Sequence, residues 1–172
     1  LTTAELLRVA GVLRSARLVK AYADGNSTTC LDDLFFDLTG NRYLEDRITK
    51  SILAEDMIAD EASPELADIR RKIRLTNNKI KDTLQSYVGG ERLKYLQDNL
   101  VTMRNGRYVV PVKSEYRNEM QGLVHDTSAS GATLFIEPMA VVEANNEIKV
   151  LESREQDEIE RILAELSQMA GE

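Results

Sequence analysis

The sequence contains few of the residues that most often carry covalent chemistry or hold metal ions. It has one cysteine, Cys30, one histidine, His125, and no tryptophan among 172 residues. A single cysteine excludes an internal disulfide and a zinc site built from several cysteines. Such sparse cysteine usage fits a reducing compartment, and we expect a cytoplasmic protein.

Long apolar runs are also missing. No stretch reaches the roughly 18 apolar residues that a membrane-spanning helix needs, and the N-terminus lacks the basic region and apolar core of a signal peptide. We therefore expect no membrane partner. Hydrophobic residues make up 42% of the chain and charged residues 30%, a balance typical of a soluble, helix-rich protein. Because the chain begins at Leu1, inside a helical pattern, we interpret it as a piece of a longer protein.

Sequence signatures of catalysis are missing as well. The chain has neither the GxxxxGK[ST] phosphate-binding loop nor the GxGxxG loop. His125 precedes Asp126 and lies near Ser128, but neighbouring strand residues point to opposite faces, which argues against a Ser–His–Asp site. An enzyme that uses His125 is therefore the weakest alternative. We assign no catalytic residue, metal or cofactor, because helix-surface or turn charge explains the acidic pairs: Asp32-Asp33, Glu45-Asp46 and Glu55-Asp56.

The apolar pattern predicts a mainly α-helical chain with an inserted small antiparallel β module. Residues 1–62 are expected to form a helical core segment. Apolar residues at helical spacing predict helices over 2–23, 31–38 and 42–53, followed by a small turn or hairpin around Met57 and Ile58.

Two long helical arms are predicted at 63–99 and 139–172. The first begins with Ser63 as cap and Pro64 in its first turn, and Gly89-Gly90 is expected to kink or restart it. Apolar spacings of three and four residues predict a coiled-coil seam, and arms of matching length predict an antiparallel pair; ordinary bundle core is the alternative. The seam residues are Leu66, Ile69, Ile73, Thr76, Ile80, Thr83 and Tyr87, then Val141, Ala144, Ile148, Leu151, Glu155, Ile159, Ile162, Leu166 and Met169.

Residues 100–138, between the arms, are expected to form a β-rich module. Asn105-Gly106 is the strongest two-residue hairpin signal. Pro111 cannot donate a ladder hydrogen bond, so its strand is predicted to lie at an edge or to bend there. The expected strands are 100–104, 107–113, 121–127 and 132–137.

Charge is distributed unevenly along the chain. The formal net charge is −7, which argues against nucleic-acid binding by the whole surface. The two long helices carry opposite signs, which favours side-by-side pairing, although two solvated faces would explain them equally well. The net charge is −4 over 1–63, +3 over 64–99, 0 over 100–138 and −6 over 139–172.

A small basic and aromatic cluster stands out in this acidic chain. Residues 101–118 hold four basic residues and one acidic residue, interleaved with tyrosines. Such a surface is suited to phosphate groups, with tyrosines available for stacking. The alternative is a solvated strand edge, where basic residues discourage aggregation. The expected nucleic-acid contacts are Arg104, Arg107, Lys113, Arg117, Tyr108 and Tyr116.

With these residues in view, the chain resembles the second bacterial MutS paralogue, the branch of the MutS family that carries a C-terminal Smr domain. The resemblance rests mainly on Arg104–Ile148, which reads RNGRYVVPVKSEYRNEMQGLVHDTSASGATLFIEPMAVVEANNEI. Asp60–Arg70, which reads DEASPELADIR, is similar to the segment that opens the lever helix of that branch.

The resemblance implies an internal fragment made of core helices, two lever arms and a clamp at about 100–138. In that family, lever and clamp belong to a dimeric ATPase, which binds ATP and Mg²⁺ and closes around DNA. This branch lacks the mismatch-reading domain and is associated with branched DNA, suppression of recombination, and stalled or collided ribosomes. Its ATPase and Smr nuclease regions are absent here, so the resemblance carries over no catalytic residue.

We therefore expect a non-catalytic lever and clamp region that grips DNA, branched or mismatched, or a ribosome; the sequence leaves that choice open. The alternative is a structural or dimerisation module that transmits ATPase motion without direct nucleic-acid contact.

Overall fold

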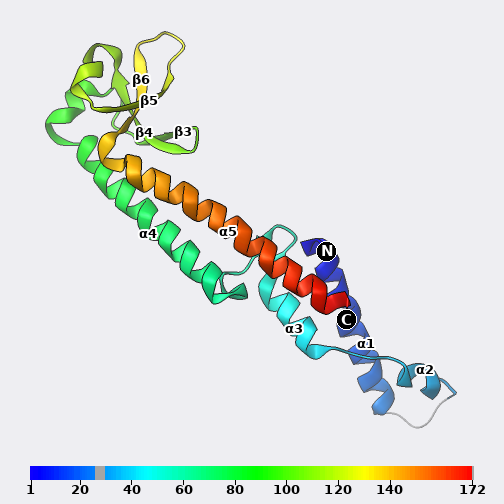
Figure 1. Cartoon of the computed structure of the whole chain (residues 1–172). Coiled ribbons are helices and arrows are strands. Elements are labelled where there is room, and N and C mark those ends of the chain that lie inside the picture. Colours follow the sequence, from blue (N-terminus) through cyan, green and yellow to red (C-terminus); the bar gives the residue numbers. More distant parts are fainter. Residues whose placement is uncertain (26–29, 172) are drawn as a thin grey trace. The chain divides into compact units, whose positions relative to one another are not determined.

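A computed structural model gives the structure of residues 1–25 and 30–171. The chain divides into two compact units (Figure 1). Unit 1 comprises residues 1–69 and 155–172, and unit 2 comprises residues 70–154. Helix is the main secondary structure, and the strands of the described residues form two small antiparallel sheets. The expected mainly α-helical chain with a small β module is therefore confirmed.

Unit 1 is a helical unit with one short hairpin. Its first helix begins with a capping box, in which Thr2 Oγ1 accepts a hydrogen bond from the Glu5 backbone and the Glu5 carboxylate accepts one from the Thr2 backbone. The three helices and the hairpin predicted for this region are confirmed. The elements are α1 Thr3–Asp24, α2 Asp32–Phe36, α3 Arg42–Ser51, β1 Ile52–Ala54, β2 Met57–Ile58 and the 3₁₀-helix η1 Asp60–Ala62.

The start of α4 (Pro64–Tyr87) and the end of α5 (Met139–Gly171) share the core of unit 1. Ser63 caps α4 as predicted, because its Oγ accepts a hydrogen bond from the Leu66 N–H at 3.0 Å. The same hydroxyl donates to Glu158 of α5 at 2.7 Å, and both side chains are buried. The apolar core consists of Leu6, Ala10, Leu44, Ile48, Ile52, Ile58, Ala62, Leu66, Ile162 and Leu166.

The first long helix ends at Tyr87, so the predicted helical continuation to residue 99 is wrong. Gly90 has a φ of +68°, a left-handed conformation that glycine adopts readily, and the 3₁₀-helix η2 (Gly90–Tyr95) follows. Leu96 then forms an isolated antiparallel bridge with Val112 and is buried. After Tyr87 the chain thus packs against the sheet through Leu96 and does not continue as an α-helix.

The buried stripes of the long helices deviate from the predicted seam. In α4, Leu84 is fully buried, whereas its predicted neighbour Thr83 is only half-buried. In α5, Asn145 and Glu158 are buried, each one residue away from a predicted apolar position. Hydrophobic periodicity cannot find such positions, because these polar side chains are buried by virtue of their hydrogen bonds.

Unit 2 contains a four-stranded antiparallel sheet with the strand order β3-β4-β6-β5. Asn105 and Gly106, with φ values of 54° and 72°, form the predicted two-residue turn between β3 and β4. All four predicted strands are confirmed. The elements are β3 Thr102–Arg104, β4 Arg107–Lys113, the 3₁₀-helix η3 Ser114–Glu119, β5 Gly122–Thr127 and β6 Thr133–Pro138.

Pro111 lies in a central strand, so the predicted edge position is wrong. On one side β4 pairs with β6, where Pro111 is opposite Phe135. On the other side β3 pairs only with residues 107–109, and the Pro111 carbonyl accepts a hydrogen bond from Gln97 N–H at 2.9 Å. Since the N and C=O of one strand residue face the same neighbour, the missing N–H of Pro111 removes no bond from the β4–β6 ladder.

The core of unit 2 joins the sheet to the end of α4 and the start of α5. Valines of β4 and Ile136 of β6 supply the sheet side of this core. Their partners come from helices, 3₁₀ segments and loops that flank the sheet. The buried members are Ile80, Leu84, Val88, Leu96, Val110, Val112, Met120, Ile136, Val141 and Ile148.

Gly122 marks a very close approach of β5 to β6. A Cβ atom built on Gly122 would lie 2.1 Å from the carbonyl oxygen of Glu137 and 2.7 Å from a methyl carbon of Ile136. Both neighbours are fully buried. Any side chain at this position must therefore push the two strands apart.

We expect Gly122→Ala to lower the free energy of unfolding by about 1–3 kcal/mol, the usual cost of overpacking. Gly11→Ala is the control, because a Cβ on this α1 residue meets no atom within 4 Å, and alanine in a helix should stabilise by roughly 0.5–1 kcal/mol. Chemical denaturation of both variants tests the difference. Equal stability of Gly122→Ala and the wild type would contradict it.

Candidate nucleic-acid interface

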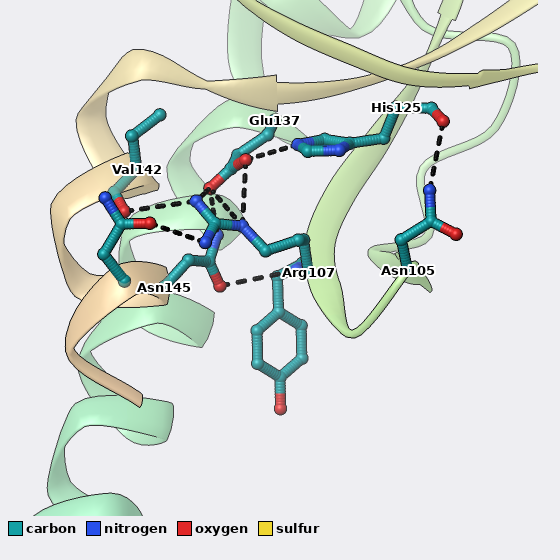
Figure 2. Close-up of polar contacts among 8 residues, drawn as sticks. Asn105, Arg107, His125, Glu137, Val142 and Asn145 are labelled. Carbon is teal, nitrogen blue, oxygen red and sulfur yellow. Dashed lines mark hydrogen bonds and ion pairs between the residues drawn. The ribbon is translucent and has the colours of Figure 1, made fainter. Parts of the chain in front are cut away.

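Unit 2 contains a buried carboxylate, Glu137 at the end of β6, which binds side chains from several elements. Figure 2 shows Glu137 between Arg107 of β4 and His125 of β5. Arg107 Nη2 donates to Glu137 Oε1 at 2.6 Å, and its Nε lies 3.1 Å from both oxygens. His125 Nε2 bonds to Oε2, and Asn145 Nδ2 of α5 donates to Oε1 at 2.8 Å. One fully buried carboxylate thus joins three strands and a helix.

A β-bulge brings His125 to this carboxylate. His125 is the extra residue between Val124 and Asp126, where the register of β5 against β6 shifts. The Asp126 carboxylate instead lies 3.3 Å from Nε of Arg104. His125 and Asp126 therefore bind different partners, and in this structure they do not form a Ser–His–Asp array.

The hydrogen bonds around Glu137 determine its ionisation. Burial raises the pKa of this carboxyl group, but hydrogen bonds from Arg107, His125 and Asn145, together with the Arg107 charge, outweigh burial and lower the pKa below its ordinary value. Glu137 is therefore ionised at neutral pH. Sequence reasoning missed this residue, although an acidic residue in the otherwise apolar strand TLFIEP was the signal that could have found it.

Arg107 has a structural role in this cluster. Its side chain is only 15% exposed, and its remaining donors reach Asn146 Oδ1 at 2.6 Å and the Val142 carbonyl at 3.4 Å. Arg107, which the sequence predicts as a nucleic-acid contact, is therefore held mainly inside unit 2. The reason is that burying Glu137 requires a buried cation beside it.

Arg104 is also engaged within unit 2. Its guanidinium group lies 4.1 Å from the centroid of the Phe135 ring and pairs with Asp126. Its Nη1 donates to the hydroxyl of Thr102 at 3.1 Å and to the carbonyl of Met103 at 2.8 Å. The side chain is 36% exposed, so Arg104 faces solvent with a charge that Asp126 partly neutralises.

Lys113 and Arg117 differ from these two arginines. Lys113 Nζ donates to the carbonyl of Lys94 at 3.3 Å, and Arg117 Nη1 donates to the carbonyl of Met120 at 3.4 Å. Neither forms an ion pair with a residue that the structure describes. Both charges are therefore available to an external anion.

Near Lys113 and Arg117 lie two cations and a tyrosine that the sequence analysis did not assign as contacts: Arg92, Lys94 and Tyr95. Tyr116 stacks at a tilt of 54° on Tyr95 of η2, with ring centroids 5.1 Å apart. Lys94 Nζ lies 4.9 Å from the Tyr95 ring, and Arg92 lies over Tyr87. The faces of these rings are thus partly covered.

The other predicted tyrosine, Tyr108, is half-buried against the core of unit 2. Of the six predicted contact residues, the structure therefore leaves Lys113 and Arg117 most available. Among residues 1–25 and 30–171, no cluster of three or more acidic, histidine or cysteine side chains is arranged to hold a metal ion. No helix within those ranges combines the length and apolarity needed to cross a membrane.

The lowered pKa of Glu137 predicts a pH dependence of stability. A group whose folded-state pKa is lowered stabilises the fold fully above its unfolded-state pKa, about 4.3 for glutamate. That contribution is lost as the pH falls through the folded-state pKa, because between the two pKa values the unfolded chain binds a proton that the folded chain does not.

We expect the stability difference between the wild type and Glu137→Gln to be largest near pH 7 and to shrink as the pH falls below about 4. Denaturant titrations between neutral and acidic pH measure it. Glu147→Gln, at an exposed position of α5, makes the same change of charge and is the control. If the stability difference between the wild type and Glu137→Gln stayed constant over this pH range, the ionisation of Glu137 would not contribute to the stability of the fold.

Comparison with known proteins gives one consistent result. The protein named Endonuclease MutS2 from Ruminiclostridium cellulolyticum is 55% identical over 176 residues, which cover 99% of this chain and 22% of that protein. Proteins of the same name from Acetivibrio thermocellus and Symbiobacterium thermophilum are 54% and 45% identical over 97% and 98% of the chain. No family profile matches the sequence. The chain spans about a fifth of the length of these curated relatives.

Proposed function

Because this chain belongs to the MutS2 family, we propose that it is the non-catalytic lever and clamp region of a MutS-type ATPase. Unit 2 grips nucleic acid in this proposal, either as DNA, branched or mismatched, or as part of a ribosome. The observation that carries it is a group of cations beside the sheet that form no ion pair with a residue of the described ranges, in a chain of net charge −7: Arg92, Lys94, Lys113 and Arg117. Phosphate oxygens are the anions that such a sequence-independent surface binds.

The lever role is proposed for α4 and α5. It is supported by the core of unit 1, which combines the start of α4 with the end of α5, and by the core of unit 2, which combines the end of α4 with the start of α5. Both groupings suit an antiparallel coiled-coil pair. In this proposal, residues 1–62 form the core segment and residues 139–172 form the returning arm. Because α4 ends at Tyr87, residues 88–99 belong to the clamp rather than to the first arm.

The remaining functions are proposed for the full-length protein rather than for this chain. They comprise ATP and Mg²⁺ binding, nuclease activity in an Smr domain, homodimerisation and a cytoplasmic location. The proposal gives the 172 residues of this chain no catalytic step of their own. The acidic residues of α5 repel phosphate and help to confine contact to the proposed clamp.

The second candidate function is a structural module that transmits ATPase motion without touching nucleic acid. The engagement of Arg104 and Arg107 by carboxylates of unit 2 favours it, because these two charges serve the fold. The two candidates differ in what they predict for the free cations.

We expect Lys113→Glu combined with Arg117→Glu, in the full-length protein, to weaken binding to every nucleic-acid sequence alike, by about tenfold or more at low salt, and to flatten its salt dependence. Binding to branched DNA and to stalled ribosomes is measured side by side. Substitution of Arg107 is unsuitable for this purpose, because it would disturb the buried cluster.

Lys20→Glu combined with Lys50→Glu is the matched control, because it makes the same change of charge in unit 1. Lys20 Nζ, like Lys113, donates to a main-chain carbonyl, that of Leu38, at 3.1 Å. The control should bind as the wild type does. Unchanged affinity of the Lys113 and Arg117 variant for both ligands would favour the structural module.

A further inference from the structure

Unit 2 contains an apolar pocket that the clamp surface described above does not use. Its volume is about 380 Å³, within the range of small-molecule sites. Its lining includes Pro111 of β4 and Phe135 of β6, together with Leu100 and Val101 of the segment that precedes β3. Thr102 and Thr133 are among the polar residues that line it.

Backbone hydrogen bonds fix the walls of this pocket. Pro111 and Phe135 are directly opposite each other in the β4–β6 ladder. The Gln97 N–H donates to the Pro111 carbonyl at 2.9 Å, and Leu96 bridges to Val112. Leu100 therefore directly follows a segment that is hydrogen-bonded to β4. Because these backbone bonds are part of the fold, the pocket exists before any ligand binds.

Two cations flank the pocket. The Arg104 guanidinium lies on the Phe135 ring, and Lys113 is directly opposite Thr133 in the sheet. Lys113 has no carboxylate partner among the described residues. An apolar pocket with polar groups at its border and a free cation beside it suits a flat, apolar ring that carries an anionic group.

We propose that this pocket receives the base of an unpaired nucleotide in DNA, while Lys113 contacts a phosphate beside it. The inference rests on the proposed function and deepens it. A nucleobase has apolar faces and a polar edge, which the hydroxyls of Thr102 and Thr133, the amide of Gln97 and the carboxylate of Asp98 match. Bases of a paired duplex are stacked and cannot enter, so the pocket selects DNA that contains an unpaired nucleotide.

The charges beside the pocket distinguish this occupant from an apolar peptide. An apolar peptide side chain offers no anion to Lys113 and no hydrogen-bond donor to the carboxylate of Asp98. The exocyclic amino group of adenine, guanine or cytosine donates to such a carboxylate. The phosphate that accompanies every base meets the lysine.

The test compares two DNA duplexes of one sequence, one fully paired and one with a single unpaired 2-aminopurine nucleotide. The wild type should bind the second at least about tenfold more tightly, as expected from contacts to one unstacked base. The fluorescence of 2-aminopurine should change on binding. If the wild type bound the two duplexes with equal affinity, the inference would be overturned. If the wild type bound neither duplex, the proposed function would be overturned as well.

Leu100→Asp and Leu93→Asp form the decisive pair of variants. Both leucines are exposed, at 64% and 46%, so folding should be retained, and thermal unfolding checks this. Only Leu100 lines the pocket, whereas Leu93 belongs to η2. Leu100→Asp should abolish the preference for the unpaired nucleotide, and Leu93→Asp should keep it even where the added charge weakens binding to both duplexes.

Two outcomes of this comparison would overturn the assignment. A preference that survives Leu100→Asp would place the unpaired base elsewhere. A preference seen with RNA that contains the same unpaired nucleotide, but absent with DNA, would exclude DNA as the ligand.

Discussion

The buried carboxylate of Glu137 is the constraint on which the organisation of unit 2 depends. Burying an ionised group away from water costs several kcal/mol of folding free energy unless an opposite charge and hydrogen bonds compensate for the lost water. Here Arg107, His125 and Asn145 compensate for it. These partners come from β4, from the bulge of β5 and from α5. Satisfying one carboxylate therefore fixes the positions of the sheet strands relative to the first turns of α5, inside the same unit.

This constraint divides the basic residues of the sheet into two groups. Arg107 forms an ion pair with the buried Glu137, and the charge of Arg104 is partly neutralised by Asp126. Lys113 and Arg117, at the other end of β4 and in η3, bond to main-chain carbonyls and form no ion pair with the residues that the structure describes. In the proposed function, the cations that are not paired inside unit 2 contact phosphate from fixed positions. Lys113 is held at the end of β4 and Arg117 in the 3₁₀-helix η3.

Much of the fold follows from local sequence signals, because each has a local physical cause. Asn105-Gly106 favours its turn, and Ser63 caps α4, irrespective of distant contacts. The 3₁₀-helix after Gly90 was not predictable in this way, because it depends on packing of Leu96 against the sheet. The cluster around Glu137 joins residues up to 38 positions apart in the sequence, Arg107 to Asn145, and no periodicity reveals such pairings.

The central claim is that the ion pair of Arg107 and Glu137 is needed as a pair, and a double-mutant cycle tests it most directly. Arg107→Met and Glu137→Met are each expected to destabilise unit 2 by about 3–5 kcal/mol, because each leaves one charge buried without its partner. The double variant leaves neither charge, so it should be more stable than either single variant in chemical denaturation. Losses that simply add in the double variant would contradict this account.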